Sequence, residues 1–244
     1  MKIIFIFFIF FVYQVQSAVI LIDPGHGGDD TGAKSSGKRI VLEKDLTLDI
    51  AKKIQKHLQK SHTAFLTRSI NRTVTLNERS ELAEKVKADL FISVHINSGT
   101  NTTGHGFETC YLDNHDNVAN KKVETVENES FGLQDKLVNQ ILIDLVIQQT
   151  VSQSKKLAQM IHSSIDQNVA GVYKLENRGV KPGLFYVLAL SKRPGVLIEV
   201  GFLSNREELS KMLNPAFQEK MAISISQAIE KYLALQTSKP QFPI

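Results

Sequence analysis

The sequence predicts an α/β fold, a single layer-type domain in which a mostly parallel six-stranded sheet is flanked by helices. Two observations support this prediction. Short apolar runs of five to eight residues recur along the chain, and they alternate with longer segments whose apolar residues return every three or four positions. Strands that alternate with helices in this way form largely parallel sheets, because each helix carries the chain back to the same end of the sheet.

The expected strands are the six short apolar runs. The first, AVILI, is apolar throughout and ends in Asp-Pro-Gly, which is typical of a buried strand that leaves the sheet through a tight turn. The fifth is LFYVL. The six runs cover residues 18–22, 63–67, 89–96, 106–112, 184–188 and 194–200.

Helices are expected between these strands. From Leu42 to Leu58 apolar residues recur every four positions among lysines, which predicts an amphipathic helix with Glu43 in its first turn. Two sequence signals mark helix starts, a capping box at Ser204 or Asn205 and the pair Asn214-Pro215. The other expected helices cover residues 76–86 and 137–165, the latter as one long or two consecutive helices.

The N-terminus, MKIIFIFFIFFVYQVQS, predicts a secretory signal peptide over residues 1–17. It has one early lysine, a dense Ile/Phe/Val core, and a cleavage point after Ser17. A membrane anchor is the alternative, but the apolar run is shorter than the ~20 residues that a membrane span needs, and no other stretch approaches that length. We therefore expect residues 18–244 to be one exported domain, periplasmic or secreted, without a transmembrane segment.

Composition narrows the function classes. A single cysteine, Cys110, excludes an internal disulfide framework and a multi-cysteine metal site, and its strand-like surroundings predict a buried thiol. The net charge of +4 is spread along the chain without a basic block, so nothing indicates nucleic-acid binding. We expect a monomer.

Two histidines and a glutamate are placed to share a metal ion. His26 follows the first strand in DPGHGG, and His95 ends the third strand in SVHINS. Carboxyl ends of neighbouring strands converge on one crevice, which the start of the helix carrying Glu43 can reach. Two imidazoles and a carboxylate are a common catalytic zinc set, with one position left for water. Taken singly, each residue has a plainer explanation, a turn for the histidines or the helix dipole for Glu43.

The glycines around His26 favour the metal site. Gly25, Gly27 and Gly28 flank the histidine so closely that the loop must either adopt backbone angles closed to other residues or admit a ligand against its backbone. Four of the remaining histidines are expected at the surface: His57, His62, His115 and His162. His105 is nearer to the site in sequence and is the alternative ligand.

Glu199 is the most anomalous residue in the chain. It interrupts the apolar run VLIEVGFL, and burying an unpaired carboxylate is costly. One explanation is a buried ion pair with a lysine or arginine. A functional role has better support, because a carboxylate near a metal-bound water is what a general base requires.

The motifs together resemble the zinc-dependent N-acetylmuramoyl-L-alanine amidases that trim peptidoglycan. The resemblance implies that His26, Glu43 and His95 bind one Zn²⁺, and that Glu199 is the catalytic general base and acid. The implied reaction is hydrolysis of the amide between N-acetylmuramic acid and the L-alanine of the stem peptide. The matching segments are IDPGHGG, LEKDLTLDIAKKI, LTRS, LNERSELAEKVKADLFISVHINS, GFETCYL, NRGVKPGLFYVL and PGVLIEVGFLSN.

Residues 113–150 interrupt the alternation of strands and helices. The first part is polar and charged, which predicts an exposed segment, and the second part predicts a helix. The resemblance extends here to relatives at the bacterial division site, in which an insertion blocks the cleft and adds a glutamate to the zinc until an activator protein displaces it. It implies that Glu127 is this inhibitory ligand, with Glu129 as the alternative; a solvated loop followed by a docking helix is the plainer interpretation.

Two other functions remain open from the sequence. One is a zinc peptidase that cuts within or between stem peptides. The other is a non-catalytic wall-binding regulator, although such a protein usually loses one of the site residues, and this chain keeps His26, Glu43, His95 and Glu199.

Overall fold

The computed structural model of the chain describes residues 17–37, 39–99, 101–114, 125, 127–128 and 136–237. The predicted signal peptide lies outside the described residues except for Ser17, as does Glu129. No helix in the described part of the chain combines the length and the hydropathy that a membrane span requires.

The described residues contain one six-stranded sheet with the order β2-β1-β3-β6-β4-β5. Strands β2, β1, β3 and β6 are mutually parallel, whereas β4 pairs antiparallel to β6 and parallel to β5. The predicted α/β fold with a mostly parallel sheet is confirmed. The strands are β1 Val19–Pro24, β2 Thr63–Leu66, β3 Leu90–Asn97, β4 Phe107–Leu112, β5 Asn177–Gly183 and β6 Gly195–Phe202.

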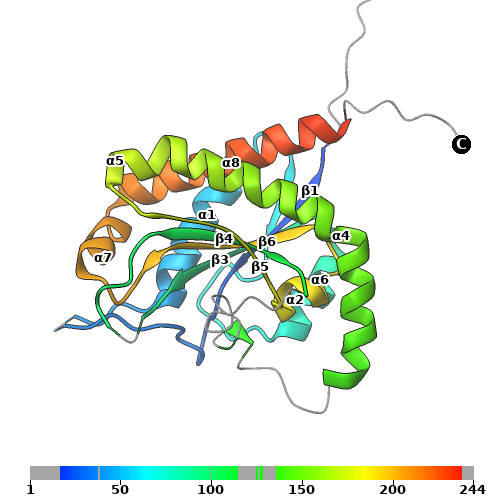
Figure 1. Cartoon of the computed structure of the whole chain (residues 1–244), viewed down its shortest axis with the longest axis horizontal. Coiled ribbons are helices and arrows are strands. Elements are labelled where there is room, and N and C mark those ends of the chain that lie inside the picture. The colour runs from blue at the N-terminus through cyan, green and yellow to red at the C-terminus, as the bar shows by residue number, and fades with distance from the viewer. Residues whose placement is uncertain are drawn as a thin grey trace, which may run out of the picture.

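Helices cover both faces of the sheet (Figure 1). Apolar residues of α1, α8 and the second half of α4 pack on one face, and those of α2, α6 and the first half of α4 pack on the other. Alternate residues of β1 serve the two layers, because successive strand side chains point to opposite faces. The helices are α1 Glu43–Leu58, α2 Leu76–Lys85, α4 Lys136–Ile165 with a π-helical turn Asp166–Ala170, α5 Gly171–Tyr173, α6 Tyr186–Ser191, α7 Arg206–Met212 and α8 Pro215–Thr237.

The prediction of the fifth strand at residues 184–188 was wrong. Most of LFYVL lies in helix α6, which begins at Tyr186, and the fifth strand is instead the preceding NRGVKPG, residues 177–183. A five-residue apolar run does not distinguish a buried strand from a short buried helix. The true strand lies at the edge of the sheet, where one side needs no ladder partner, so proline is tolerated and half-exposed polar residues are stable.

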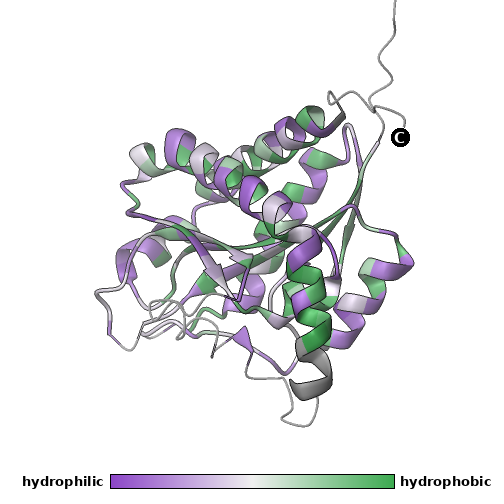
Figure 2. Ribbon diagram, turned by 45° about the vertical axis from the view of Figure 1, so that its right-hand side comes forward, coloured by the Kyte–Doolittle hydropathy of each residue, from purple (hydrophilic) through white to green (hydrophobic). Residues whose placement is uncertain are grey.

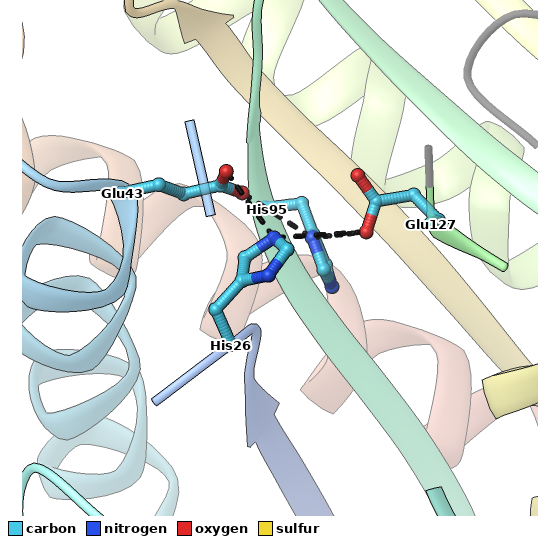
Figure 3. Close-up of side chains that lie close together, drawn as sticks. All are labelled: His26, Glu43, His95 and Glu127. Carbon is cyan, nitrogen blue, oxygen red and sulfur yellow. Dashed lines mark ion pairs between the residues drawn. The ribbon is translucent and has the colours of Figure 1, made fainter. Parts of the chain in front are cut away.

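The parallel strands direct three segments to one edge of the sheet. His26 follows the carboxyl end of β1, and His95 lies near the carboxyl end of β3. Glu199 of β6 is the direct register partner of His95. Helix α1 begins at Glu43, and its first turn faces the same edge (Figure 3). The fold therefore brings residues that are more than 170 positions apart in sequence into one region.

Candidate metal centre

The loop after β1 places His26 by means of unusual backbone angles. His26 adopts a left-handed conformation with φ of 59°, and Gly27 and Gly28 follow with φ of 133° and 62°. A Cβ atom on Gly25 would collide with the ring of His95, and one on Gly27 would collide with the backbone oxygen of Arg72. The first of the two alternatives expected for these glycines, backbone angles closed to most other residues, is therefore present at Gly27 and Gly28.

Four side chains converge in front of the sheet edge (Figure 3). The ligand atoms of His26, Glu43, His95 and Glu127 all lie within 4.8 Å of one another. His26 Nε2 is 3.2 Å from Glu43 Oε2, and His95 Nδ1 is 3.3 Å from Glu43 Oε1. Glu127 Oε2 lies 2.8 Å from His95 Nδ1 and 3.8 Å from His26 Nε2.

These separations fit a tetrahedral zinc site. Zinc binds nitrogen and oxygen ligands at about 2.0–2.2 Å, so neighbouring tetrahedral ligand atoms lie roughly 3.3 Å apart. The two histidine nitrogens that face the group are buried, and within the described residues neither makes a hydrogen bond of good geometry despite the nearby carboxylates. Short separations without hydrogen bonds are expected when the lone pairs of the histidine nitrogens and carboxylate oxygens point at a common centre rather than at each other.

The surroundings orient the first two of these side chains. Asp30 accepts from His26 Nδ1 at 2.9 Å, which fixes the proton on Nδ1 and leaves Nε2 free to bind a metal. Glu43 Oε2 accepts from the backbone nitrogen of Ala33 at 2.8 Å, and Oε1 accepts from that of Ile96 at 2.9 Å. Each carboxylate oxygen of Glu43 is therefore held while its remaining lone pair faces a histidine.

The charges of the metal-free group balance one another. Burial opposes the charged form of His26, but the neighbouring Glu43 carboxylate and the hydrogen bond to Asp30 together outweigh it and raise the pKa of His26 to about 9. Burial likewise opposes the charge on Glu43, and the attraction of His26 and His95 keeps the pKa of Glu43 below its ordinary value.

Glu199 lies in the same cavity but outside the four-residue group. The cavity has a volume of 690 Å³, and its lining includes all four candidate ligands and Glu199. Glu199 is 1 % exposed, and neither carboxylate oxygen has a hydrogen-bond partner among the described residues. Burial, followed by repulsion from the Glu127 carboxylate, raises the pKa of Glu199 well above its ordinary value. The ion pair that would explain this residue structurally is absent from the described part of the chain.

Asn128, the residue after Glu127, is hydrogen-bonded to the domain next to the cavity. The amide nitrogen of Asn128 donates to the Leu184 oxygen at 2.6 Å, and its Oδ1 accepts from the Tyr186 nitrogen at 2.9 Å. Asn128 therefore binds the backbone just before and at the start of α6. This pair of contacts holds the adjacent Glu127 side chain, which is 9 % exposed, against His95.

Several residues differ from the sequence-based expectations. His62 and His162, expected at the surface, are 8 % and 6 % exposed. His162 hydrogen-bonds to Asn177 and stacks on Phe107, because α4 crosses the sheet there. The sequence also gave no indication of Asp30, which lies in a polar loop where a carboxylate is ordinary. Cys110 is buried and free, as predicted, and His115 lies outside the described residues.

Comparison with known proteins gives one consistent result. The sequence profile of the family described as N-acetylmuramoyl-L-alanine amidase matches residues 20–231. The chain is 33 % identical over 224 residues to the N-acetylmuramoyl-L-alanine amidase AmiA of Escherichia coli (strain K12), an alignment that covers 88 % of this chain and 75 % of that protein.

Solved structures share the fold. An N-acetylmuramoyl-L-alanine amidase from Clostridium difficile 630 superposes with a TM-score of 0.69 at 30 % sequence identity, covering 92 % of this chain and 99 % of that one. The CwlD amidase from Clostridioides difficile, solved in complex with the GerS lipoprotein, gives a TM-score of 0.70 at 26 % identity, covering 90 % of this chain and 100 % of that one.

Proposed function

The chain belongs to the N-acetylmuramoyl-L-alanine amidase family, and from this premise we propose that it cleaves peptidoglycan with one Zn²⁺ held by His26, Glu43 and His95. The bond cut is the amide between the lactyl group of N-acetylmuramic acid and the L-alanine of the stem peptide. The observation that supports this proposal best is the group of two imidazoles and two carboxylates with zinc-like spacing beside a buried, unpaired glutamate.

The residues divide the chemistry between them. His26, His95 and Glu43 would hold the zinc ion, which would supply a Lewis acid that polarises a carbonyl and lowers the pKa of water. Glu199 takes a proton from the water that attacks the amide carbon, and it returns that proton to the departing L-alanine nitrogen as the carbon–nitrogen bond breaks. The products are the lactyl carboxylate on the glycan and a free amino terminus on the stem peptide.

Mass spectrometry of digested sacculi tests this function directly. We expect glycan without peptide together with intact stem peptides. Cut stem peptides would instead identify a zinc peptidase, and an unchanged digest with binding to sacculi would identify a non-catalytic wall-binding regulator. Glu199→Gln should reduce the rate by about 100-fold or more while zinc content stays at that of the wild type, because general acid–base catalysis contributes that much. Full activity of Glu199→Gln would reject its assignment.

We also propose that Glu127 is an inhibitory fourth zinc ligand. Its position beside both histidines supports this role, because a fourth protein ligand occupies the place that water and substrate need. An activator protein would then have to displace the segment. Support for such a partner comes from two apolar side chains on the largely hydrophobic first half of α4 (Figure 2), Ile141 and Leu145, which are 72 % and 49 % exposed. The complex of the related CwlD amidase with a lipoprotein is consistent with a partner of this kind.

Export follows from the substrate. Peptidoglycan lies outside the cytoplasmic membrane, so the proposed activity requires a periplasmic or secreted protein. N-terminal sequencing of the protein purified from cell envelope or medium tests cleavage after Ser17. A chain that still begins at Met1 and pellets with membranes would favour the anchor instead.

A further inference from the structure

One buried arginine connects the segments that carry two of the candidate zinc ligands. Arg68 follows β2 and is 1 % exposed. Its Nε donates to the backbone oxygen of His26 at 2.7 Å and to that of Pro24 at 3.1 Å. Its Nη2 donates to the backbone oxygens of Gly25 and Lys44, both at 2.8 Å. A single guanidinium group therefore binds the loop of His26 and the first turn of α1, next to Glu43.

The neighbouring groups show that the loop is built around this side chain. A Cβ atom on Gly27 would lie 2.8 Å from both Cδ and Nε of Arg68, so glycine is required there for the arginine to approach. Thr47 Oγ1 donates to the Gly25 oxygen at 3.0 Å and accepts from Arg68 Nη2 at 3.2 Å. Arg79 adds a second guanidinium, which donates to the His26 oxygen at 2.9 Å.

The chemistry of the group explains why arginine is needed. A buried cation is costly unless its donors are matched, and oxygen acceptors match Nε and Nη2 of Arg68, whereas its buried Nη1 has no hydrogen-bond partner among the described residues. The guanidinium is planar and rigid, so it fixes the separation of the atoms that it binds, whereas a lysine ammonium on a flexible stem does not. The Arg68 contacts described above are with backbone oxygens and a threonine hydroxyl, away from the histidine nitrogens that face the metal group.

We infer that Arg68 is a positioning residue that sets the spacing between His26 and Glu43 and thereby the zinc affinity of the site. This inference rests on the proposed function. Groups that orient metal ligands from outside the coordination sphere typically change metal affinity or activity by about 10- to 100-fold when replaced. Arg68→Lys, which keeps the charge and removes the rigid fork, should weaken zinc binding within this range.

The test compares Arg68→Lys with the matched control Arg193→Lys. Arg193, which follows α6, forms an ion pair with Glu84 of α2, and neither residue lines the cavity. Zinc affinity is measured in full-length protein by competition with a coloured chelator, and the visible spectrum of the Co²⁺-loaded protein reports the ligand geometry. We expect weaker zinc binding and an altered cobalt spectrum for Arg68→Lys, with both unchanged for Arg193→Lys. Thermal unfolding of the metal-free proteins separates these effects from a loss of global stability.

A second variant keeps the test decisive if Arg68→Lys does not fold. Thr47→Val is nearly isosteric and removes one hydrogen bond to the loop, which should weaken zinc binding by about 2- to 10-fold. Wild-type zinc affinity and cobalt spectrum in the folded variant, even with a lower melting temperature, would overturn the positioning role. A wild-type protein that binds no zinc or releases no stem peptide would instead reject the proposed function, so the two failures are distinguishable.

Discussion

Glu127→Gln is predicted to make the enzyme more active and to weaken its zinc binding at the same time. The substitution keeps the shape of the side chain and removes its negative charge. The carboxylate lies 2.8 Å from His95 Nδ1 and is 9 % exposed, so solvent screens its interactions only weakly. An ion pair this short and this buried is worth a net ~1.5–3 kcal/mol, between the ~0–1 kcal/mol of an exposed pair and the ~3–5 kcal/mol lost when a fully buried pair is broken. A change of about 1.4 kcal/mol in free energy is a tenfold change in an equilibrium constant. The ratio of the closed state, in which Glu127 lies beside His95, to the open state should therefore fall by about 10- to 150-fold.

The assay must separate the two opposite effects. Release of dye from labelled sacculi is measured at saturating zinc, where weaker metal binding no longer limits the rate, and zinc affinity is measured separately. The Asn128 contacts remain in this variant, so we expect a gain in activity near the lower end of the range. Glu129→Gln, the same change at the alternative residue, is the matched control and should leave both quantities unchanged.

The result that would refute inhibition by Glu127 is specific. If zinc-saturated Glu127→Gln is no faster than the wild type while its fold and zinc content are intact, the carboxylate does not restrict access to the site. If Glu129→Gln alone gains activity, the inhibitory role belongs to residue 129.

Three further predictions follow from the same geometry. Asn128→Ala should raise basal activity, by up to about 100-fold, because it removes two hydrogen bonds that hold the segment; Asn168→Ala, which also removes an amide–carbonyl bond, is the control and should have no effect. Zinc binding at pH 7 should release protons, measured by calorimetry in buffers of different ionisation enthalpy. The reason is that the pKa of His26 is raised from 6.5 to about 9, so a zinc ion must displace a proton from this imidazole at pH 7. The same shift makes the charged His26 stabilise the fold fully below pH 6.5, and this stabilisation is lost as the pH rises through about 9. Acetate should inhibit Glu127→Ala, because it can replace the missing carboxylate, whereas neutral acetamide should not; equal inhibition by both would argue against a charge-specific contact.

The convergence of the candidate metal ligands was predictable because it depends on topology more than on detail. Parallel strands deliver their carboxyl ends to one edge, so His26 and His95 meet there whatever the exact twist of the sheet. Glu199 was identifiable for a different reason, since a carboxylate in an apolar run conflicts with its surroundings unless it has a function. Both signals lie within a few residues of the side chain concerned.

The supporting residues gave no such signal. Arg68 reads as an ordinary polar residue after a strand, and its burial follows only when the loop of His26 and the start of α1 close around it. The side chain of Asn128 hydrogen-bonds to backbone groups of Leu184 and Tyr186. Both residues lie in the run 184–188, which the sequence predicted to be a strand. Contacts between side chains and distant backbone atoms carry no sequence pattern, because the backbone partner is the same for every residue type.

Charge balance connects the proposed inhibition by Glu127 with catalysis. Two neutral imidazoles and the carboxylates of Glu43 and Glu127 together carry the charge of −2 that neutralises a divalent cation. Without Glu127 the cation and its three remaining protein ligands would together carry one net positive charge in a buried cavity, where electrostatic interactions are stronger than in water. Amide hydrolysis builds negative charge on the substrate carbonyl oxygen, and a preorganised positive centre stabilises that charge. Displacement of a single glutamate would thus supply both a free coordination position and the electrostatic stabilisation that the reaction needs, whereas a neutral blocking side chain would supply only the first.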